Sequence, residues 1–473
     1  MRLSARLLAA SALALTLVAA PAAAQDAATI ARAATIRDAA LNENIALDYV
    51  TQLTTRFGAR PAGSKAEQDA SAWAADYMRA QGFQNVRIEE FPLVGWERGE
   101  ESAAIVGARP QRLAVVALGH SPGTNGPIEA EVVRFDSLEA LNAAPAGSLA
   151  GKIAFIDAGQ MVRMQDGAGY GPLTRIRGAG PGAAAAKGAV AFIMRSVGSD
   201  EHRMPHTGTT RYIDGVVPLP GFALAAPDAD TVSRLIGMGE TVRLRLSSTA
   251  HTYETVSQNV IGDIVGRSRP NEIIVLGSHM DSWDLGTGAI DDGAGGAITL
   301  AAAKAIAESG RRPARTVRVV LYGSEEVDQP NNTGNGGGAY LRGIGAAADQ
   351  HIIAGESDFG ADRVYALRLP PGAQTSDFAR AAAQVLYPIG VLSSAEPELY
   401  GGADVGPLAG VGVPMFGLSQ DGTRYFDLHH TADDTLDKID PEQMSQNVAA
   451  WAALVWLIAD SDVDFRSMRP AAD

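Results

Sequence analysis

The order of apolar and polar residues predicts helices in the N-terminal part of the chain. Residues 26–56 are Ala-rich and helical in pattern, and the turn-forming residues 57–64 interrupt them. Residues 65–81 carry apolar side chains at helical spacing, which is typical of an amphipathic helix, and Gly82 follows as a C-cap. Residues 86–91 then alternate apolar and polar positions as a strand does.

Short apolar runs in the second half of the chain predict buried strands separated by helices. Residues 271–276 and 316–321 are rich in β-branched side chains, and a weaker run covers residues 350–354. The Ala-rich residues 294–309 between the first two runs predict a helix. This alternation of strand and helix indicates an α/β fold.

The pattern of apolar runs and turn residues changes between residues 119 and 248. Strand-like runs at 132–135, 152–156 and 191–194 are separated by turns that are rich in Gly and Pro. We interpret residues 119–248 as a module inserted into a larger domain, which consists of residues 25–118 and 249–473.

The N-terminus has the three parts of a secretory signal peptide. Arg2 and Arg6 form a positive start, Leu7–Ala20 is a short apolar run, and Ala22–Ala24 fits the small-residue cleavage pattern. The apolar run is short for a membrane span, so we favour a signal peptide over residues 1–24 rather than a membrane anchor. The mature chain would then lie in the periplasm or outside the cell, with no attachment to the membrane.

Composition narrows the classes of function. The formal net charge is -15, from 39 Lys and Arg against 54 Asp and Glu, which argues against a nucleic-acid partner. The chain has no cysteine, so disulfides, thiolate metal sites and a cysteine nucleophile are excluded. An exported chain without cysteine suits an oxidising compartment.

A histidine and several carboxylates lie on the loop between the strand at 271–276 and the following helix. His279, Asp281 and Asp291 are among them. In an open α/β sheet, the carboxyl ends of the strands are the usual place for a ligand site. Neutral imidazole and carboxylate oxygens are ligands that divalent zinc accepts, so this loop predicts half of a two-metal hydrolase site.

Two adjacent glutamates, Glu325 and Glu326, follow the strand at 316–321 and therefore face the same edge of the sheet. Burying two ionised carboxylates is costly unless a cation compensates them. One glutamate can bind a metal ion while the other acts as a general base on water. A solvated acidic turn is the alternative, and the neighbouring His279 loop argues against it.

Asp358 follows the third strand, and His430 lies in an acidic segment near the C-terminus. Either residue alone would be uninformative. Together with the earlier candidates they supply one nitrogen ligand for each of two metal ions, a bridging carboxylate and one terminal carboxylate for each ion. The set that fits a pair of zinc ions is His279, Asp291, Glu326, Asp358 and His430.

Competing chemistries have weaker support. No Gly-x-Ser-x-Gly elbow stands beside a matching triad, and the His-Glu-x-x-His motif is absent. Asn335–Gly338 is not a phosphate-binding loop, because no Gly-Lys-Ser or Gly-Lys-Thr follows it.

Five segments resemble the co-catalytic di-zinc aminopeptidase family and, within it, the carboxypeptidase Q branch. These segments are Gly277–Asp284, Gly288–Gly293, Glu325–Glu326, Glu356–Asp358 and His430–Thr435. Their order and spacing agree with the family over nearly all of the mature chain. The resemblance implies a zinc-exopeptidase fold with a mixed, mainly parallel sheet between helices, and a protease-associated domain inserted over residues 119–248.

The resemblance also implies two overlapping ligand sets. Asp291 would bridge two zinc ions, with His279 and Asp358 completing one site and Glu326 and His430 completing the other. The family often carries a cis peptide at the position of Asp291-Asp292, so we expect one here.

Three further residues receive roles from the same resemblance. Asp281 would hydrogen-bond the outer nitrogen of His279 and fix its tautomer. Glu325 would take a proton from the metal-bridging water and pass it to the leaving amine. Tyr400 roughly matches a tyrosine that stabilises the oxyanion in some relatives, with a purely structural role as the alternative, and His429 occupies the other position where relatives carry such a tyrosine.

The chain departs from the family after the glutamate pair. Relatives continue into a short turn that contains glycine, whereas Val327–Asn335 has the character of an insertion. We expect this loop and the inserted module to carry side chains that select the substrate.

The sequence therefore predicts a secreted, zinc-dependent metallo-exopeptidase that hydrolyses short peptides as an aminopeptidase, a dipeptidase or a carboxypeptidase. The alternatives are a non-catalytic peptide-binding relative and a single-zinc glutaminyl cyclase on the same fold, and the complete ligand set argues against both. A third alternative is a carboxypeptidase-type family that also has a Glu-Glu pair. That family lacks the motif Gly277–Asp284 around His279, which argues against it. Analogy with the branch implies a homodimer.

Overall fold

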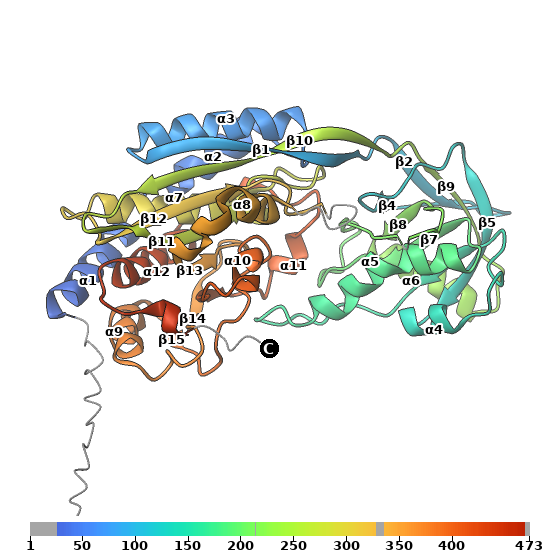
Figure 1. Cartoon of the computed structure of the whole chain (residues 1–473). Helices are drawn as coiled ribbons and strands as arrows, with labels where there is room; N and C mark the ends of the chain where they lie inside the picture. The colour runs from blue at the N-terminus through green and yellow to red at the C-terminus, as the bar shows by residue number, and fades with distance from the viewer. Residues whose placement is uncertain (1–25, 213, 328–334, 469–473) are drawn as a thin grey trace, which may run out of the picture.

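The computed structural model describes residues 26–212, 214–327 and 335–468 (Figure 1). The signal peptide predicted for residues 1–24 and most of the insertion predicted for Val327–Asn335 lie outside the described residues. Among the described residues, no helix combines the length and the apolar character that a membrane crossing needs.

A mixed sheet of five strands, in the order β1-β10-β12-β11-β13, forms the centre of the larger unit. β12 and β13 run parallel to β11, whereas β10 is antiparallel to both β1 and β12. The expected mainly parallel sheet is therefore present only in the part that contains β12, β11 and β13. The strands are β1 (Gln84–Glu97), β10 (His251–Ile264), β11 (Arg269–His279), β12 (Arg315–Tyr322) and β13 (His351–Glu356).

Helices cover both faces of this sheet because alternate strand residues point to opposite sides. Val317, Val319 and Leu321 of β12 join the larger apolar core, whereas Val320 and Tyr322 face a smaller core on the other side. The larger core is covered by α1 (Ala27–Asn42), α2 (Ala46–Phe57), α3 (Lys65–Ala80), α7 (Ala294–Ala307) and α12 (Pro441–Ala459). The smaller core is covered by α8 (Gly336–Ile344) and α10 (Gly406–Gly410).

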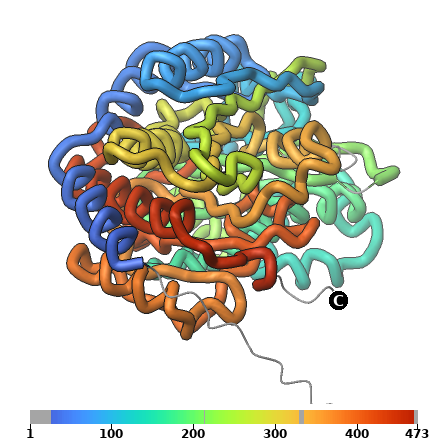
Figure 2. The backbone as a smooth tube through the Cα atoms, turned by 60° about the vertical axis from the view of Figure 1, so that its left-hand side comes forward, coloured from blue at the N-terminus to red at the C-terminus, as the bar shows by residue number. Residues whose placement is uncertain are grey.

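The first and last long helices lie side by side. Figure 2 shows α1 in blue along α12 in red, and the indole nitrogen of Trp456 donates to the carbonyl oxygen of Thr29 at 3.2 Å. α12 is buried along nearly its whole second half, as its run of apolar residues predicts. Segments from both ends of the described chain thus complete one core.

A second sheet of eight strands, in the order β3-β2-β9-β5-β6-β7-β8-β4, forms a smaller unit. The chain enters this unit from β1 and returns through β10, which pair from Gln84↔Asp263 to Glu97↔His251 as a long antiparallel ribbon (Figure 1). The inserted unit therefore comprises residues 98–250. The boundary predicted at residue 119 is too late, because β2, β3 and β4 precede it and pair into this sheet.

The strands of the inserted unit are β2 (Glu101–Ile105), β3 (Gln111–Leu113), β4 (Val115–Ala117), β5 (Ile128–Phe135), β6 (Ile153–Ile156), β7 (Ala191–Arg195), β8 (Gly221–Leu224) and β9 (Arg243–Ser248). Its helices are α4 (Leu138–Ala143), α5 (Tyr170–Ala186) and α6 (Ala226–Gly237). The three strands predicted near residues 132, 152 and 191 correspond to β5, β6 and β7, which are parallel neighbours.

A small sheet, β15-β14-β16, follows β13 in the chain. It consists of β14 (Val364–Arg368), β15 (Leu392–Ser393) and β16 (Gly417–Gln420), with α9 (Asp377–Leu386) between the first two. The chain then passes through α11 (Tyr425–Leu428) to His429 and His430. After this sheet the chain returns to the edge at which β11, β12 and β13 end, so His429 and His430 lie at that edge.

Candidate metal centre

His279 is the last residue of β11 and is 2% exposed. Its Nδ1 lies 2.9 Å from the carbonyl oxygen of Asp281, which can only accept, so Nδ1 carries the proton. In the neutral ring, Nε2 then presents a lone pair. That nitrogen faces Asp291 Oδ1 at 3.2 Å and Asp358 Oδ1 at 3.4 Å.

His430 has the same arrangement on the other side of Asp291. Its Nδ1 lies 3.2 Å from the carbonyl oxygen of Thr207, so this nitrogen also donates to backbone. Its Nε2 lies 3.0 Å from Glu326 Oε2 and 3.3 Å from Asp291 Oδ2. Burial lowers the pKa of His430 to about 4, which keeps the ring neutral and its lone pair available.

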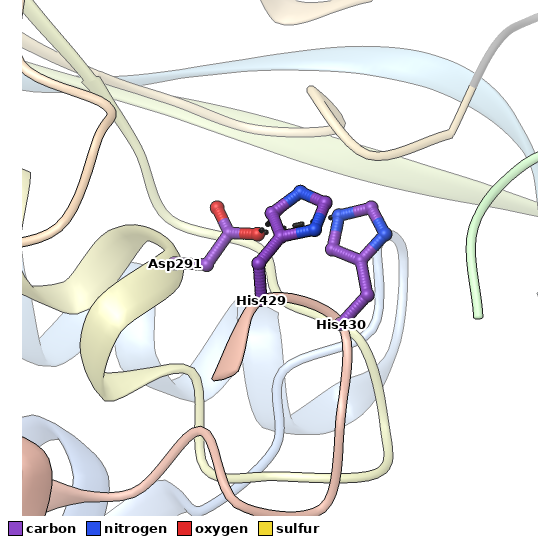
Figure 3. Close-up of side chains that lie close together, drawn as sticks. All are labelled: Asp291, His429 and His430. Atoms are coloured by element: carbon purple, nitrogen blue, oxygen red, sulfur yellow. Dashed lines mark ion pairs between the residues drawn. The ribbon is translucent and has the colours of Figure 1, made fainter. Parts of the chain in front are cut away.

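Asp291 lies between the two histidines and is 4% exposed. Burial opposes ionisation, but the contacts with His279 and His430 hold the pKa of Asp291 well below its usual value. In Figure 3 the Asp291 carboxylate points toward the stacked rings of His429 and His430, whose centroids are 3.4 Å apart. His429 Nε2 lies 3.5 Å from Asp291 Oδ2, although this histidine was not predicted to be a ligand.

The donor set fits a divalent cation. Imidazole lone pairs that face carboxylate oxygens at these distances repel them unless a proton or a cation lies between. Each of the three candidate carboxylate ligands also has one buried oxygen without a hydrogen-bond partner among the described residues, namely Asp291 Oδ2, Glu326 Oε1 and Asp358 Oδ1. One ligand atom from each of His279, Asp291 and Glu326 lies within 4.8 Å of the others. The structure thus brings all five predicted ligands together around Asp291.

Glu325 and Glu326 leave the end of β12 through Ser324, which has a left-handed φ of 62°. The carboxylate of Asp281 accepts the backbone N–H of Glu325 at 3.0 Å and that of Glu326 at 3.2 Å. The nearest contact of the Asp281 carboxylate with His279 Nδ1 is longer, at 3.6 Å. Asp281 therefore orients His279 through its backbone oxygen and holds the glutamate turn with its side chain, which differs from the predicted role.

The two glutamates have different surroundings. Glu326 is 7% exposed, and its Oε2 accepts the indole N–H of Trp283 at 2.6 Å. Glu325 is only half-buried. Burial raises the pKa of both carboxyls, and the charge of Asp291 raises that of each further. Glu325 is thus placed at the accessible rim of the centre, whereas Glu326 is fixed in its wall.

Asp291 and Asp292 are joined by a cis peptide, as the family pattern predicts. The Asp292 carboxylate accepts the backbone N–H of His279 at 3.1 Å and that of Gly295 at 2.9 Å. It therefore ties the end of β11 to the start of α7.

Arg60 supports the same loop and had no signal in the sequence. It is completely buried, and its guanidinium donates to the carbonyl oxygens of Met280 at 2.8 Å, Thr287 at 2.7 Å and Gly288 at 2.9 Å. These bonds satisfy backbone groups that would otherwise be buried without partners.

Tyr400 lies on the loop before α10 and is 59% exposed. Partial burial and then the negative charges of Glu356 and Glu325 raise its pKa to about 12, so its hydroxyl stays a donor at neutral pH. Its role as an oxyanion donor stays a prediction. Tyr170 of the inserted unit, which sequence reasoning missed, contacts the histidine pair, with Oη 3.4 Å from His429 Nε2.

The inserted unit makes further contacts with the histidine segment. Arg177 Nη1 donates to the carbonyl oxygen of Thr207 at 3.2 Å, beside His430. His206 Nδ1 donates to the carbonyl oxygen of His429 at 2.7 Å, and its Nε2 pairs with Asp200 Oδ1 at 2.6 Å. The inserted unit thus supports the backbone of His429 and the ring of the candidate ligand His430, both in the larger unit.

Comparison with known proteins agrees with this geometry. Residues 259–455 match Peptidase family M28. Carboxypeptidase Q of Mus musculus is 34% identical over 431 residues, which cover 89% of this chain and 87% of that protein. The crystal structure of a Peptidase M28 precursor from Shewanella amazonensis SB2B has 41% identity and a TM-score of 0.89, and the match covers 94% of this chain and 99% of that chain.

A more distant structure shares the fold. BSAP, a zinc aminopeptidase from Bacillus subtilis, has 18% identity and a TM-score of 0.61, with 89% of this chain and 97% of that chain covered. The sequence match over most of the chain and the ligand arrangement around Asp291 lead to one assignment: the chain belongs to peptidase family M28.

Proposed function

We propose that the chain is an exported, zinc-dependent exopeptidase that hydrolyses short peptides and holds two zinc ions. The observation that carries this proposal is the position of Asp291. Its two carboxylate oxygens lie 3.2 Å from Nε2 of His279 and 3.3 Å from Nε2 of His430. A carboxylate that offers one oxygen to each of two imidazoles is what a bridging ligand of a two-metal site requires.

The remaining ligands divide between the two histidines. Asp358 lies beside His279, and Glu326 lies beside His430, so each ion would have one imidazole, one terminal carboxylate and a share of Asp291. When bound, the two zinc ions would act as Lewis acids that lower the pKa of water and polarise the scissile carbonyl.

Glu325 is the residue that would move the proton. Its backbone N–H donates to the Asp281 carboxylate, which holds it at the rim, and burial raises the pKa of its carboxyl, which strengthens it as a base. In the proposed reaction it accepts a proton from the attacking water and delivers it to the amine that leaves.

A peptide has an open route to this centre. A polar cleft of ≈ 220 Å³ opens beside Asp358, and its wall includes Arg368 and Glu398 of the larger unit and Asp166 of the inserted unit. Such a cleft suits the polar backbone and the charged terminus of a short peptide. Tyr400, on the loop next to this cleft, is the proposed oxyanion donor.

The proposal includes the predicted export and the identity of the inserted unit. A signal peptide over residues 1–24 is supported by its order of positive, apolar and small residues. We propose that residues 98–250 are a protease-associated domain, supported by the resemblance of the sequence to the carboxypeptidase Q branch and by the contacts of this unit with His429 and His430. A homodimer stays a proposal by analogy with the branch.

The function is tested with the mature chain, residues 25–473. We expect about two zinc ions per chain by elemental analysis and hydrolysis of unblocked dipeptides, with both lost on dialysis against a zinc chelator and restored by zinc. A chain that holds two zinc ions but cleaves no peptide, with free or blocked ends, would refute the proposed activity. One zinc ion per chain together with cyclisation of N-terminal glutamine would instead support the cyclase alternative.

A further inference from the structure

A second cavity, of ≈ 170 Å³, lies beside Glu326 and shares no lining residue with the cleft beside Asp358. Its walls come from the segment before α3, the ends of β1 and β10 where the inserted unit joins, and the loop after β11. The lining is mainly apolar, and its apolar members are Pro61, Ala62, Trp96, Tyr253, Trp283 and Val327.

The polar groups of the two indoles are already bonded. Trp283 donates its N–H to Glu326 Oε2 at 2.6 Å, and Trp96 donates to the carbonyl oxygen of Ser121 at 2.9 Å. The two rings pack edge to face, with centroids 6.1 Å apart and an interplanar angle of 74°. The walls are therefore held in place, and neither indole N–H is free to bind a ligand.

The one cation in the lining is neutralised. Arg98 donates to the two carboxylate oxygens of Asp284 at 2.7 and 2.6 Å, and its guanidinium lies 5.0 Å from the centre of the Trp96 ring. A carboxylate that entered this cavity would lose water and would meet no cation among the lining residues except Arg98, which is already paired, so its entry costs free energy. An apolar group would gain free energy by leaving water.

The size and the position of the cavity define its occupant. A cavity of about 150 Å³ lined by apolar side chains holds a benzene-sized group, so this one matches a single Leu or Phe side chain. Glu326 belongs both to the cavity wall and to the candidate zinc ligands. The group that can occupy the cavity while a peptide bond lies at the metal centre is a side chain next to that bond.

We infer that this cavity is a specificity pocket for one apolar side chain, of Leu to Phe size, adjacent to the scissile bond. The inference rests on the proposed peptidase function and adds the class of substrate. It also gives the inserted unit a part in specificity, because Trp96 lies one residue before the end of β1, where the chain enters that unit.

The test uses two Ala-to-Leu substitutions, one that reduces the volume of the pocket and one that reduces the volume of a control cavity elsewhere. Ala62 is 2% exposed and lines the pocket, whereas Ala189 lines a cavity of ≈ 520 Å³ in the inserted unit that contains no candidate zinc ligand. The zinc-loaded wild type, Ala62→Leu and Ala189→Leu are compared on dipeptides that carry Leu, Phe, Gly or Asp on either side of the bond.

The wild type should prefer Leu and Phe over Gly in one of the two positions by at least tenfold in kcat/KM, the scale that an apolar pocket gives. Ala62→Leu should reduce kcat/KM for those Leu and Phe peptides by about tenfold and leave the Gly peptides within about twofold. Ala189→Leu should match the wild type. An equal loss on all peptides in Ala62→Leu would overturn the inference, as would the absence of any apolar preference in the wild type.

Two further measurements test the pocket if Ala62→Leu does not fold or if no peptide is cleaved. Tyr253→Ala removes a half-buried ring from the wall and should shift preference toward larger side chains, and an unchanged preference would count against the pocket. Calorimetric titration of the zinc-loaded protein with free leucine and free aspartate measures the pocket without turnover. Leucine binding without any hydrolysis would refute the peptidase function but support the pocket, and equal binding of both amino acids would refute the pocket.

Discussion

The carbonyl oxygen of Thr207, in the inserted unit, lies 3.2 Å from Nδ1 of His430, in the larger unit. The same oxygen accepts a hydrogen bond from Arg177 Nη1 at 3.2 Å. Arg177 Nη1 and His430 Nδ1 are 3.4 Å apart, and because both carry protons they share the Thr207 oxygen rather than bond to each other. A backbone atom of the inserted unit thus fixes the tautomer of a candidate zinc ligand.

Replacing Arg177 with Met should weaken zinc binding at the His430 side of the centre. The Thr207 carbonyl would lose its second donor and its fixed position, and loss of a partner that orients a ligand typically costs about 10- to 100-fold in metal affinity. Competition against a chromophoric chelator measures the affinity, and hydrolysis should recover at higher zinc concentration. Arg175→Met, on the exposed face of α5, is the matched control. Wild-type zinc affinity in the Arg177 variant would disprove this role.

Replacing Glu325 with Gln should abolish turnover while zinc stays bound. The amide keeps the size of the side chain but cannot accept a proton from water, and general bases contribute about 10²–10⁴-fold to rate. Elemental analysis should give the wild-type zinc content, and kcat for the best dipeptide should fall by about that factor. Glu308→Gln, at the exposed end of α7, should behave as the wild type. Activity that survives in the Glu325 variant would remove this residue from the mechanism.

Replacing Asp281 with Asn should disturb the glutamate turn more than His279. The carboxylate accepts two backbone N–H groups, from Glu325 and Glu326, whereas an amide can accept from only one and presents its own N–H groups to the other. We expect kcat to fall about 100-fold, with the weaker zinc affinity on the Glu326 side of the centre. Asp69→Asn, exposed on α3, is the control. If zinc were lost first from the His279 side, the role predicted from sequence would hold instead.

Much of the centre was predictable because strand ends leave a clear pattern. His279, Glu325 and Asp358 follow three apolar runs, and parallel strands β12, β11 and β13 bring their carboxyl ends to one edge of the sheet. A run of β-branched residues followed directly by a histidine or a carboxylate is visible without any tertiary information. His279, Glu326 and Asp358 could therefore be named as candidate ligands from the strand ends, whereas Asp291 and His430 were named from the donor count and the family resemblance.

The contacts from the inserted unit could not be predicted in this way. Thr207 is 223 residues from His430 in the chain and acts through its carbonyl oxygen, which every residue type possesses. The strands β2, β3 and β4 have only 5, 3 and 3 residues, too few for a period of two to stand out, so the boundary of the unit was set too late. His279 Nδ1 lies 2.9 Å from the backbone oxygen of Asp281 and 3.6 Å from its carboxylate. The spacing of residues in the sequence cannot show which of these two oxygens accepts the hydrogen bond, because the two distances differ by less than 1 Å.

His351, at the start of β13, is not among the candidate ligands and couples the stability of the fold to acid pH. It is completely buried, its Nδ1 donates to the carbonyl oxygen of Ala347 at 2.9 Å, and its Nε2 accepts from the Tyr340 hydroxyl at 2.7 Å. Burial, together with the nearby charges of Arg318 and Arg466, lowers the pKa of His351 from 6.5 to about 4. Because the folded pKa lies below the unfolded one, the unfolded chain binds the proton more tightly.

The contribution of His351 to stability is therefore complete above about pH 6.5 and is lost as the pH falls toward 4. Between pH 7.5 and pH 5 the loss should be about 2 kcal/mol, because each pKa unit corresponds to about 1.4 kcal/mol. Urea unfolding of the wild type and of His351→Gln at both pH values isolates this residue, since every other titrating group is shared. The stability difference between them should shrink by that amount at pH 5. His251→Gln, which removes an exposed histidine on β10, is the control substitution. An equal difference at both pH values for His351→Gln would mean that His351 is not the group that couples folding to protons.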